Sequence, residues 1–212
     1  MKVGILGSGD VARALGSGFV EHGHEAKLGS RSPEKLDRWA AEAGDGATVG
    51  SFSEAAAFGE LVVIACLGSA VDDVLELAGP AAFAGKVVID ATNPLRFRDD
   101  GPPELFVGFD DSLGERVQRR LPEAKVVKAF NIVGNAHMVD PDLPGGPPTM
   151  FIGGDDDDAK ATVAAILEDF GWEVSDLGGI DASRVLEPMC IAWVRHGMTA
   201  GSWDIAFKML GA

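Results

Sequence analysis

The residues with the clearest chemical potential lie close to the N-terminus, in the segment Gly7-Ser8-Gly9-Asp10-Val11-Ala12. A run of apolar and small residues precedes this segment and an amphipathic helical pattern follows it, so it joins a strand to a helix. Gly7 permits a tight turn, Gly9 lets the backbone contact a pyrophosphate, and Ala12 keeps helix and strand close. The free N–H groups and the dipole of the helix then face the phosphates. In this context the pattern predicts a dinucleotide-binding turn rather than a purely structural glycine turn.

The end of the next expected strand indicates which dinucleotide fits. Sites for NAD place a carboxylate about twenty residues after the glycines, where it bonds the ribose 2′-hydroxyl. Positions 29 to 32 contain no acid but do contain Ser30 and Arg31, and Lys35 follows one helical turn later. Hydroxyl donors, a guanidinium and an ammonium suit a phosphate dianion. We therefore expect NADP, with an ordinary helix cap and a solvated arginine as the alternative.

The other reactive residue types argue against metal and acid–base catalysis. Cys66 has no histidine or basic residue close in sequence, which indicates a small pocket residue rather than a nucleophile. His22 and His24 flank a turn with no third ligand nearby, which predicts a solvent-exposed turn, and the acids 155–158 precede a helix whose dipole they complement. The chain has no tyrosine, which excludes the Tyr-Lys proton donor of short-chain dehydrogenases. We expect no metal and no catalytic side chain, but direct hydride transfer to a flat acceptor, where catalysis is mostly positioning.

Strand-like segments alternate with helical ones along the chain and must position these residues. Strands are expected at residues 3–6, 25–28, 47–49, 61–65, 86–90, 125–129, 149–153 and 172–175. The unbroken apolar run from Leu61 to Ala65 is typical of a central parallel strand that is covered on both faces. Ser32 and Pro33 predict a helix from about Pro33 to Ala43. The rhythm predicts the α/β class, with a doubly wound, Rossmann-type, mostly parallel sheet.

We expect a single NADP-binding domain over residues 1–212, with a β/α extension from about 149 and a helical tail from about 181. Residues 97–111 are rich in Gly, Pro and Asp, which predicts an irregular segment, either a disordered loop or a lid. Leu186, Met189 and Trp193 make the tail helix apolar on several sides, so it is core or lies against a partner subunit. This pattern predicts a homodimer formed through the tail helix.

Composition limits the partners and the compartment. A net charge of −15 repels nucleic acid and anionic membranes. No apolar run approaches the ~20 residues that a membrane helix needs, and the first strand leaves no room for a signal peptide. The two cysteines form no C-x-x-C pair, which favours a reducing cytosol. We expect a cytoplasmic protein that acts on a small-molecule hydride acceptor and binds neither nucleic acid nor membrane.

Several segments together resemble the family of NADPH-dependent oxidoreductases related to coenzyme F420:NADP oxidoreductase. They are Gly7-Ser8-Gly9-Asp10-Val11, Gly29-Ser30-Arg31, Ala91-Thr92-Asn93-Pro94-Leu95, Val127-Lys128-Ala129-Phe130-Asn131 and Leu186-Glu187-Pro188. The resemblance runs from residue 2 to about residue 196, and reductase domains of membrane metalloreductases are similar at greater distance. It implies a homodimeric Rossmann protein in which a deazaflavin lies face to face with the nicotinamide and hydride passes directly between the rings. The positions expected to bind the cofactor are Gly7, Ser8, Gly9, Asp10, Val11, Ser30, Arg31, Lys35, Ala65, Cys66, Leu67, Asn93, Pro94, Ala129 and Asn131.

The chain departs from that family where the acceptor would lie. It has Asn131 where the deazaflavin enzymes are expected to have a histidine, and its tail from Leu186 onward differs. The acceptor, coenzyme F420 or a flavin, and the direction of the reaction therefore stay open. We expect Asn93 and Asn131 to orient a carboxamide or ring carbonyl, or else to satisfy loop backbone, and Leu67 and Pro94 to form a flat apolar wall. A non-catalytic NADP-binding module that senses redox state through a partner is the competing hypothesis.

Overall fold

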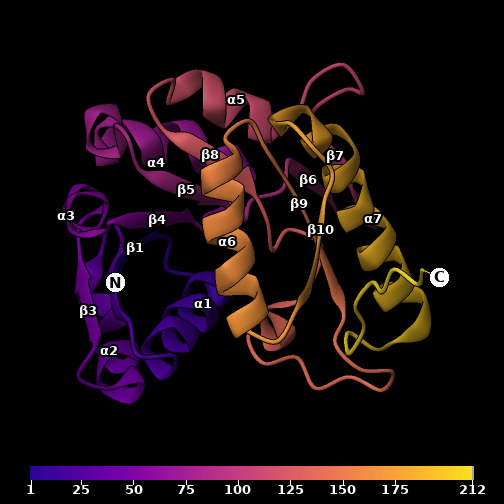
Figure 1. Cartoon of the computed structure of the whole chain (residues 1–212), viewed down its shortest axis with the longest axis horizontal. Helices are drawn as coiled ribbons and strands as arrows, with labels where there is room; N and C mark the ends of the chain where they lie inside the picture. The colour runs from indigo at the N-terminus through magenta and orange to yellow at the C-terminus, as the bar shows by residue number, and fades with distance from the viewer. Residues whose placement is uncertain (212) are drawn as a thin grey trace.

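The computed structural model describes residues 1–211 and shows an eight-stranded sheet with helices on both faces (Figure 1). The strand order is β10-β9-β8-β5-β4-β1-β2-β3. These strands are β1 (Lys2–Leu6), β2 (Glu25–Gly29), β3 (Ala47–Gly50), β4 (Leu61–Ile64), β5 (Val87–Asp90), β8 (Lys125–Lys128), β9 (Thr149–Gly154) and β10 (Glu173–Asp176). Neighbouring strands pair in parallel except β8 and β9, which are antiparallel. The predicted doubly wound, mostly parallel α/β fold is confirmed.

The helices follow the strands in the expected alternation. The α-helices are α1 (Asp10–Glu21), α2 (Asp37–Ala43), α3 (Phe52–Phe58), α4 (Val71–Ala78), α5 (Leu113–Arg120), α6 (Asp157–Asp169) and α7 (Ser183–Ala200). Short 3-10 turns are η1 (Pro33–Leu36), η2 (Gly68–Ala70), η3 (Pro80–Phe83), η4 (Asn135–His137) and η5 (Ile180–Ala182). The helix predicted from Pro33 to Ala43 is thus divided into η1 and α2, and the Ser32 side chain makes no capping bond. No helix among residues 1–211 is long and apolar enough to cross a bilayer.

The core consists of two buried clusters, one on each face of the sheet. In β4, Val63 belongs to the cluster under α1 and α6, while Val62 and Ile64 belong to the cluster under α3, α4 and α5. Successive strand side chains point to opposite faces. A strand that is covered on both sides must therefore be apolar throughout, and β4 is fully buried. This arrangement leaves the carboxyl ends of β1, β2, β4 and β5 at one edge of the sheet.

Residues 97–111, expected to be irregular, instead belong largely to a hairpin. Strands β6 (Leu95–Arg98) and β7 (Gly101–Leu105) pair antiparallel and form a separate two-stranded sheet. Arg98 on β6 bonds Glu104 across the hairpin and also contacts Asp100. Proline is tolerated in a strand at an edge, where its missing N–H is not needed, so the Pro-rich sequence concealed this strand pair. In Figure 1 the hairpin lies between the main sheet and α7.

The apolar residues of α7 that suggested a dimer pack within the chain itself. Leu186 is fully buried, and Met189 packs against the larger core cluster. Trp193 donates from Nε1 to the carbonyl oxygen of Ile205 at 2.9 Å and its ring lies 5.1 Å from that of Trp203. Intramolecular packing therefore accounts for the apolar residues that suggested a dimer through this helix, and the homodimer stays a prediction.

Candidate functional site

A cleft of about 1010 Å³ runs along the carboxyl ends of the strands. It is the edge at which ligands bind in open α/β sheets, next to the point where the strand order reverses between β1 and β4. Three residues expected to bind the cofactor, Pro94, Ala129 and Asn131, do not line the cleft. The others line it: Gly7, Ser8, Gly9, Asp10, Val11, Ser30, Arg31, Lys35, Ala65, Cys66, Leu67 and Asn93.

The glycine turn between β1 and α1 has the geometry of a phosphate cradle. A Cβ on Gly7 would lie 2.3 Å from the carbonyl oxygen of Ala65, so only glycine lets β1 and β4 approach here. A Cβ on Gly9 would meet nothing within 4 Å, because that position faces the open cleft. The N-terminus of α1 has no side-chain cap. Its N–H groups are therefore available to an anion, as the N-terminus of a phosphate-binding helix requires.

A cationic pair lies at the end of β2. Arg31 and Lys35 are exposed, and neither forms an ion pair within residues 1–211. Ser30 is buried, with 8 % of its surface exposed. Its hydroxyl oxygen accepts a hydrogen bond from the N–H of Ser32 at 3.1 Å. That bond orders the loop and leaves the Ser30 hydroxyl hydrogen free to donate. The arrangement fits a phosphate group held by two cations and a hydroxyl.

Three apolar residues that line the cleft were not predicted from the sequence. Phe52, at the start of α3, lies against Gly29, where an added Cβ would come within 3.1 Å of the Phe52 Cα. Val74 and Leu77 on α4 line the same part of the cleft. Their helical spacing resembles that of core residues, and Val74 is indeed buried, so no sequence pattern marked them as residues that also line the cleft.

Asn93 and Asn131 are joined to one another. Asn93 donates from Nδ2 to the backbone oxygen of Asn131 at 2.7 Å, and Asn131 donates from Nδ2 to Asn93 Oδ1 at 3.0 Å. Asn131 also donates to the carbonyl oxygen of Leu186 at 2.9 Å, which ties the pair to α7. Asn131 is 2 % exposed and its Oδ1 has no partner among the described residues. Asn93 therefore faces the cleft, while Asn131 lies behind it and fixes its orientation.

Pro94 and Ala129 also lie behind the cleft surface. Pro94 is buried, and its carbonyl oxygen accepts a bond from the N–H of Phe106, so it forms the base of the hairpin. Ala129, directly after β8, has no exposed surface. Of the two residues expected to form an apolar wall, Leu67 lines the cleft, together with Leu95 and Phe97, and Pro94 does not.

Cys66 lines the cleft but is not an activated thiol. Burial, together with the nearby Asp90 carboxylate, raises the pKa of the Cys66 thiol to about 12. The thiolate is the nucleophilic form of cysteine. The side chain thus stays protonated at physiological pH and can contribute only contact surface.

A buried ionic cluster behind the cleft was not predicted. Lys128, Asp90 and Glu187 are all fully buried, and Lys128 Nζ lies 2.9 Å from Asp90 Oδ2 and 2.9 Å from Glu187 Oε1. Lys128 also donates to the carbonyl oxygen of Thr92 at 2.7 Å. Burial alone would lower the pKa of Lys128, but the two carboxylates outweigh it and raise that pKa above its ordinary value. The lysine is therefore charged, and it fixes the segment that leads into Asn93.

Glu187 extends this cluster to α7 and α5. Its carboxylate accepts bonds from the N–H groups of Leu113 at 3.0 Å and Gly114 at 2.9 Å, at the N-terminus of α5. A carboxylate at this end of a helix is favoured by the helix dipole. Arg184, one turn earlier on α7, donates two bonds to Glu115 at 2.8 and 2.6 Å. These contacts hold α7 against the sheet.

The two histidines near residue 23 have a structural role. His22, expected in an exposed turn, lies 3.1 Å from Asp140 and 3.0 Å from Asp169 and joins α1 to the end of α6. Burial would lower the pKa of His22, but the two carboxylates raise it. No cluster of three or more His, Cys, Asp or Glu side chains suited to a metal ion occurs in the part of the chain that the structure describes.

Comparison with known proteins identifies the family. Residues 2–94 match the sequence model of the family described as NADP oxidoreductase, coenzyme F420-dependent. A crystal structure from Arthrobacter sp. FB24, of a protein provisionally named an F420-dependent NADP-reductase, is 37 % identical, covers 100 % of both chains and has a TM-score of 0.94. The chain belongs to the coenzyme F420-dependent NADP oxidoreductase family. As a member of this family it is an NADP-dependent oxidoreductase.

Curated relatives of this F420-dependent NADP oxidoreductase family member are more distant. The F420-dependent NADP reductase of Methanocaldococcus jannaschii is 28 % identical over 88 % of each chain. Metalloreductase STEAP3 of Rattus norvegicus is 31 % identical over 88 % of this chain, which spans only 36 % of the length of that protein. The similarity to the metalloreductase is therefore confined to one part of it.

Proposed function

We propose that this oxidoreductase transfers hydride between NADP(H) and a flat ring acceptor, a deazaflavin or a flavin. The observation that carries the proposal is the single continuous cleft. Its lining contains the uncapped helix N-terminus, the two unpaired cations Arg31 and Lys35, and exposed apolar side chains. Its volume of about 1010 Å³ lies at the upper end of the range for ligand sites. Such a cleft has room for an extended dinucleotide.

The residues of the chain suit NADP in three places. The N–H groups of Ser8 to Val11 would hold the pyrophosphate, and Ser30, Arg31 and Lys35 would hold the 2′-phosphate. Ala65, Cys66, Leu67 and Asn93 would line the nicotinamide. Three other residues, Pro94, Ala129 and Asn131, do not line the cleft. We assign them the role of supporting the residues that do.

The side chains expected to line the nicotinamide, those of Ala65, Cys66, Leu67 and Asn93, offer no acid or base. Cys66 keeps its proton, Asn93 is engaged with Asn131, and Leu67, Leu95 and Phe97 are apolar. The cofactor, when bound, supplies the hydride. The protein would then accelerate transfer by holding two flat rings at about 3–3.5 Å and excluding water.

The proposal is tested by anaerobic assays with NADPH and a panel that contains coenzyme F420, FMN, riboflavin and a quinone. We expect loss of the NADPH absorbance with at least one flat acceptor, and no loss with Gly9→Ala as the matched control. NADPH that binds and is not oxidised with any acceptor would instead favour the redox-sensing module.

A further inference from the structure

Two large apolar side chains stand exposed at one end of the cleft. Leu67, in the loop after β4, is 65 % exposed, and Phe97, on β6, is 69 % exposed. Single exposed apolar residues are common on protein surfaces. Here both residues line the same concave site, although they come from separate segments, and the exposed Leu77 of α4 also lines it. That combination is typical of a surface that a ligand covers.

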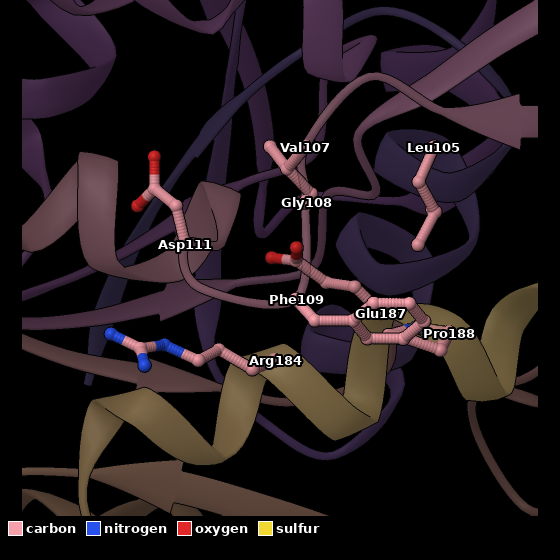
Figure 2. A pocket seen from close by; sticks show the side chains of 8 residues that line it. All are labelled: Leu105, Val107, Gly108, Phe109, Asp111, Arg184, Glu187 and Pro188. Atoms are coloured by element: carbon pink, nitrogen blue, oxygen red, sulfur yellow. The ribbon is translucent and has the colours of Figure 1, made fainter.

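The hairpin β6–β7 brings Phe97 to the cleft. Leu95 pairs with Leu105 across the hairpin, so their side chains share one face. Leu95 lines the cleft, and Leu105 lines a second, apolar cavity of about 220 Å³ beside α7. Figure 2 shows this second cavity, where the Phe109 ring lies by the Glu187–Pro188 turn of α7. The apolar face of the hairpin thus faces the body of the protein.

The opposite face of the hairpin is charged and exposed. Arg96 pairs with Glu104 across the strands, and Arg98 forms ion pairs with Glu104 and Asp100. These two faces fix the orientation of the hairpin, because rotation about its axis would bury the charges and expose Leu95 and Leu105. Phe97 lies between the paired residues Arg96 and Arg98, where the register of the hairpin shifts, and it lines the cleft.

The cleft around Leu67 and Phe97 is lined by uncharged side chains of β6 and η2, two elements in contact with each other, and the acids of the cleft, Asp10, Asp73 and Glu76, belong to α1 and α4. Its other lining residues there are Gly68, Ser69, Leu95 and Asn135. The cations of the cleft, Arg31 and Lys35, belong to the loop after β2 instead. This end of the cleft can hold a ring by apolar contact and stacking, but it offers no partner for a phosphate.

We propose that Phe97 and Leu67 form the slot that receives the ring of the hydride acceptor, with Phe97 as the specificity-determining residue. This inference rests on the proposed function and adds to it the residues that contact the acceptor. The slot holds an uncharged aromatic ring between apolar surfaces and does not bind the acceptor's phosphate. Aromatic stacking of this kind tolerates different ring systems, because every ring has a π-face.

The test compares Phe97→Ala and Phe97→Trp with Phe109→Ala in the full chain. Phe109 is the matched control because it is 89 % exposed and lines only the second cavity. Three quantities are measured: the Kd for NADPH, KM and kcat with riboflavin and FMN, and quenching of riboflavin fluorescence by protein saturated with NADP. Melting curves establish that each variant is folded.

We expect Phe97→Ala to raise KM for both flavins by about tenfold or more and to leave the NADPH Kd within about threefold. Phe97→Trp should restore KM, Phe109→Ala should match the unaltered protein, and riboflavin and FMN should have KM values within about threefold of each other. An unchanged KM in Phe97→Ala would overturn the slot. So would an equal loss of NADPH affinity, which would place Phe97 in the cofactor site.

The two proposals fail in different ways. Turnover that survives Phe97→Ala unchanged overturns the slot and leaves hydride transfer standing. Riboflavin quenching that is lost in Phe97→Ala, in a protein that never oxidises NADPH, supports the slot and overturns hydride transfer. Absence of both quenching and turnover in the unaltered protein overturns both.

Discussion

At the level of single residues, we expect Arg31 to decide cofactor choice. It is exposed at the end of β2 and has no ion-pair partner within the described chain, so its charge is available to a 2′-phosphate. Arg31→Ala should weaken NADPH binding by about 1.5–3 kcal/mol, the range for charge-assisted hydrogen bonds. NADH binding should barely change, because NADH lacks that phosphate. Titration of both cofactors measures the difference.

The control for this prediction is Arg38→Ala. Arg38 is also exposed and lies nearby on α2, but it pairs with Glu42 and does not line the cleft. The Arg38→Ala variant should therefore leave the affinities for NADPH and NADH unchanged. Equal losses of NADPH and NADH affinity in Arg31→Ala would contradict the assignment of a 2′-phosphate site.

Two glycines of the turn should respond differently to the same substitution. Gly7→Ala would force a Cβ to 2.3 Å from the Ala65 carbonyl oxygen, so it should destabilise the junction of β1 and β4. Gly9→Ala adds a methyl group in open space, where it occupies the position of a pyrophosphate. We expect a lower melting temperature for Gly7→Ala, and for Gly9→Ala an unchanged melting temperature with loss of NADPH binding. A folded Gly9→Ala that binds NADPH normally would mean that the phosphates do not lie at this turn.

At the level of elements, the buried cluster of Lys128, Asp90 and Glu187 joins two strands to α7. Lys128→Met would leave two carboxylates buried without their counter-charge, which costs about 3–5 kcal/mol of unfolding free energy. The control is Lys125→Met, on the same strand, because Lys125 is 39 % exposed and pairs with Asp156 near the surface. Urea unfolding compares the two. Similar losses would contradict a structural role for the cluster.

The pH dependence of this cluster follows from the raised pKa of Lys128. The pKa of the lysine is higher in the folded protein than the ordinary value of 10.5. Its contribution to stability is therefore complete below pH 10.5 and is lost only as the pH rises through the higher folded value. Between pH 6 and 9 the contribution of the charged lysine to the stability of the unaltered protein should therefore stay constant.

Most of the confirmed predictions rest on local sequence patterns. The glycine turn and the strand alternation depend on neighbouring residues, so the sequence was enough to predict them. Asn131 was assigned to the cleft because its strand ends there, yet its contact with the Leu186 carbonyl oxygen places it one layer behind. The cluster joins residues 90, 128 and 187, and no local pattern links such distant positions. The hairpin was missed because prolines usually argue against strands.

At the level of the whole molecule, the homodimer remains a prediction. The apolar residues that suggested it, Leu186 and Trp193, contact the chain's own core and tail. Val185 and Met198 of α7 are more than half exposed, at 56 % and 51 %, and are the positions on this helix that a second copy could still cover. Light scattering at micromolar concentration should give twice the chain mass of 22.1 kDa. A mass of one chain would contradict the prediction.

The negative net charge of the molecule affects how the cleft can bind an anionic cofactor. The chain carries a net charge of −15, which repels anions over most of its surface. NADPH is itself an anion, so its binding depends on the few groups that oppose this field. The N-terminus of α1 and the pair Arg31 and Lys35 lie in one cleft, and we expect them to supply that attraction. The affinity for NADPH should therefore depend on those groups more than on the total charge.

Direct hydride transfer is tested most directly by following the hydrogen itself. NADPH deuterated on one face of the nicotinamide C4 is mixed with coenzyme F420 for a single turnover in ordinary water. The deazaflavin carbon that receives hydride does not exchange its hydrogen with water, so mass spectrometry can locate the label. Transfer between stacked rings predicts that NADPH labelled on one face delivers its deuterium to the reduced deazaflavin and that NADPH labelled on the other face does not. Label found in water, or NADPH that binds without any label leaving it, would contradict direct transfer.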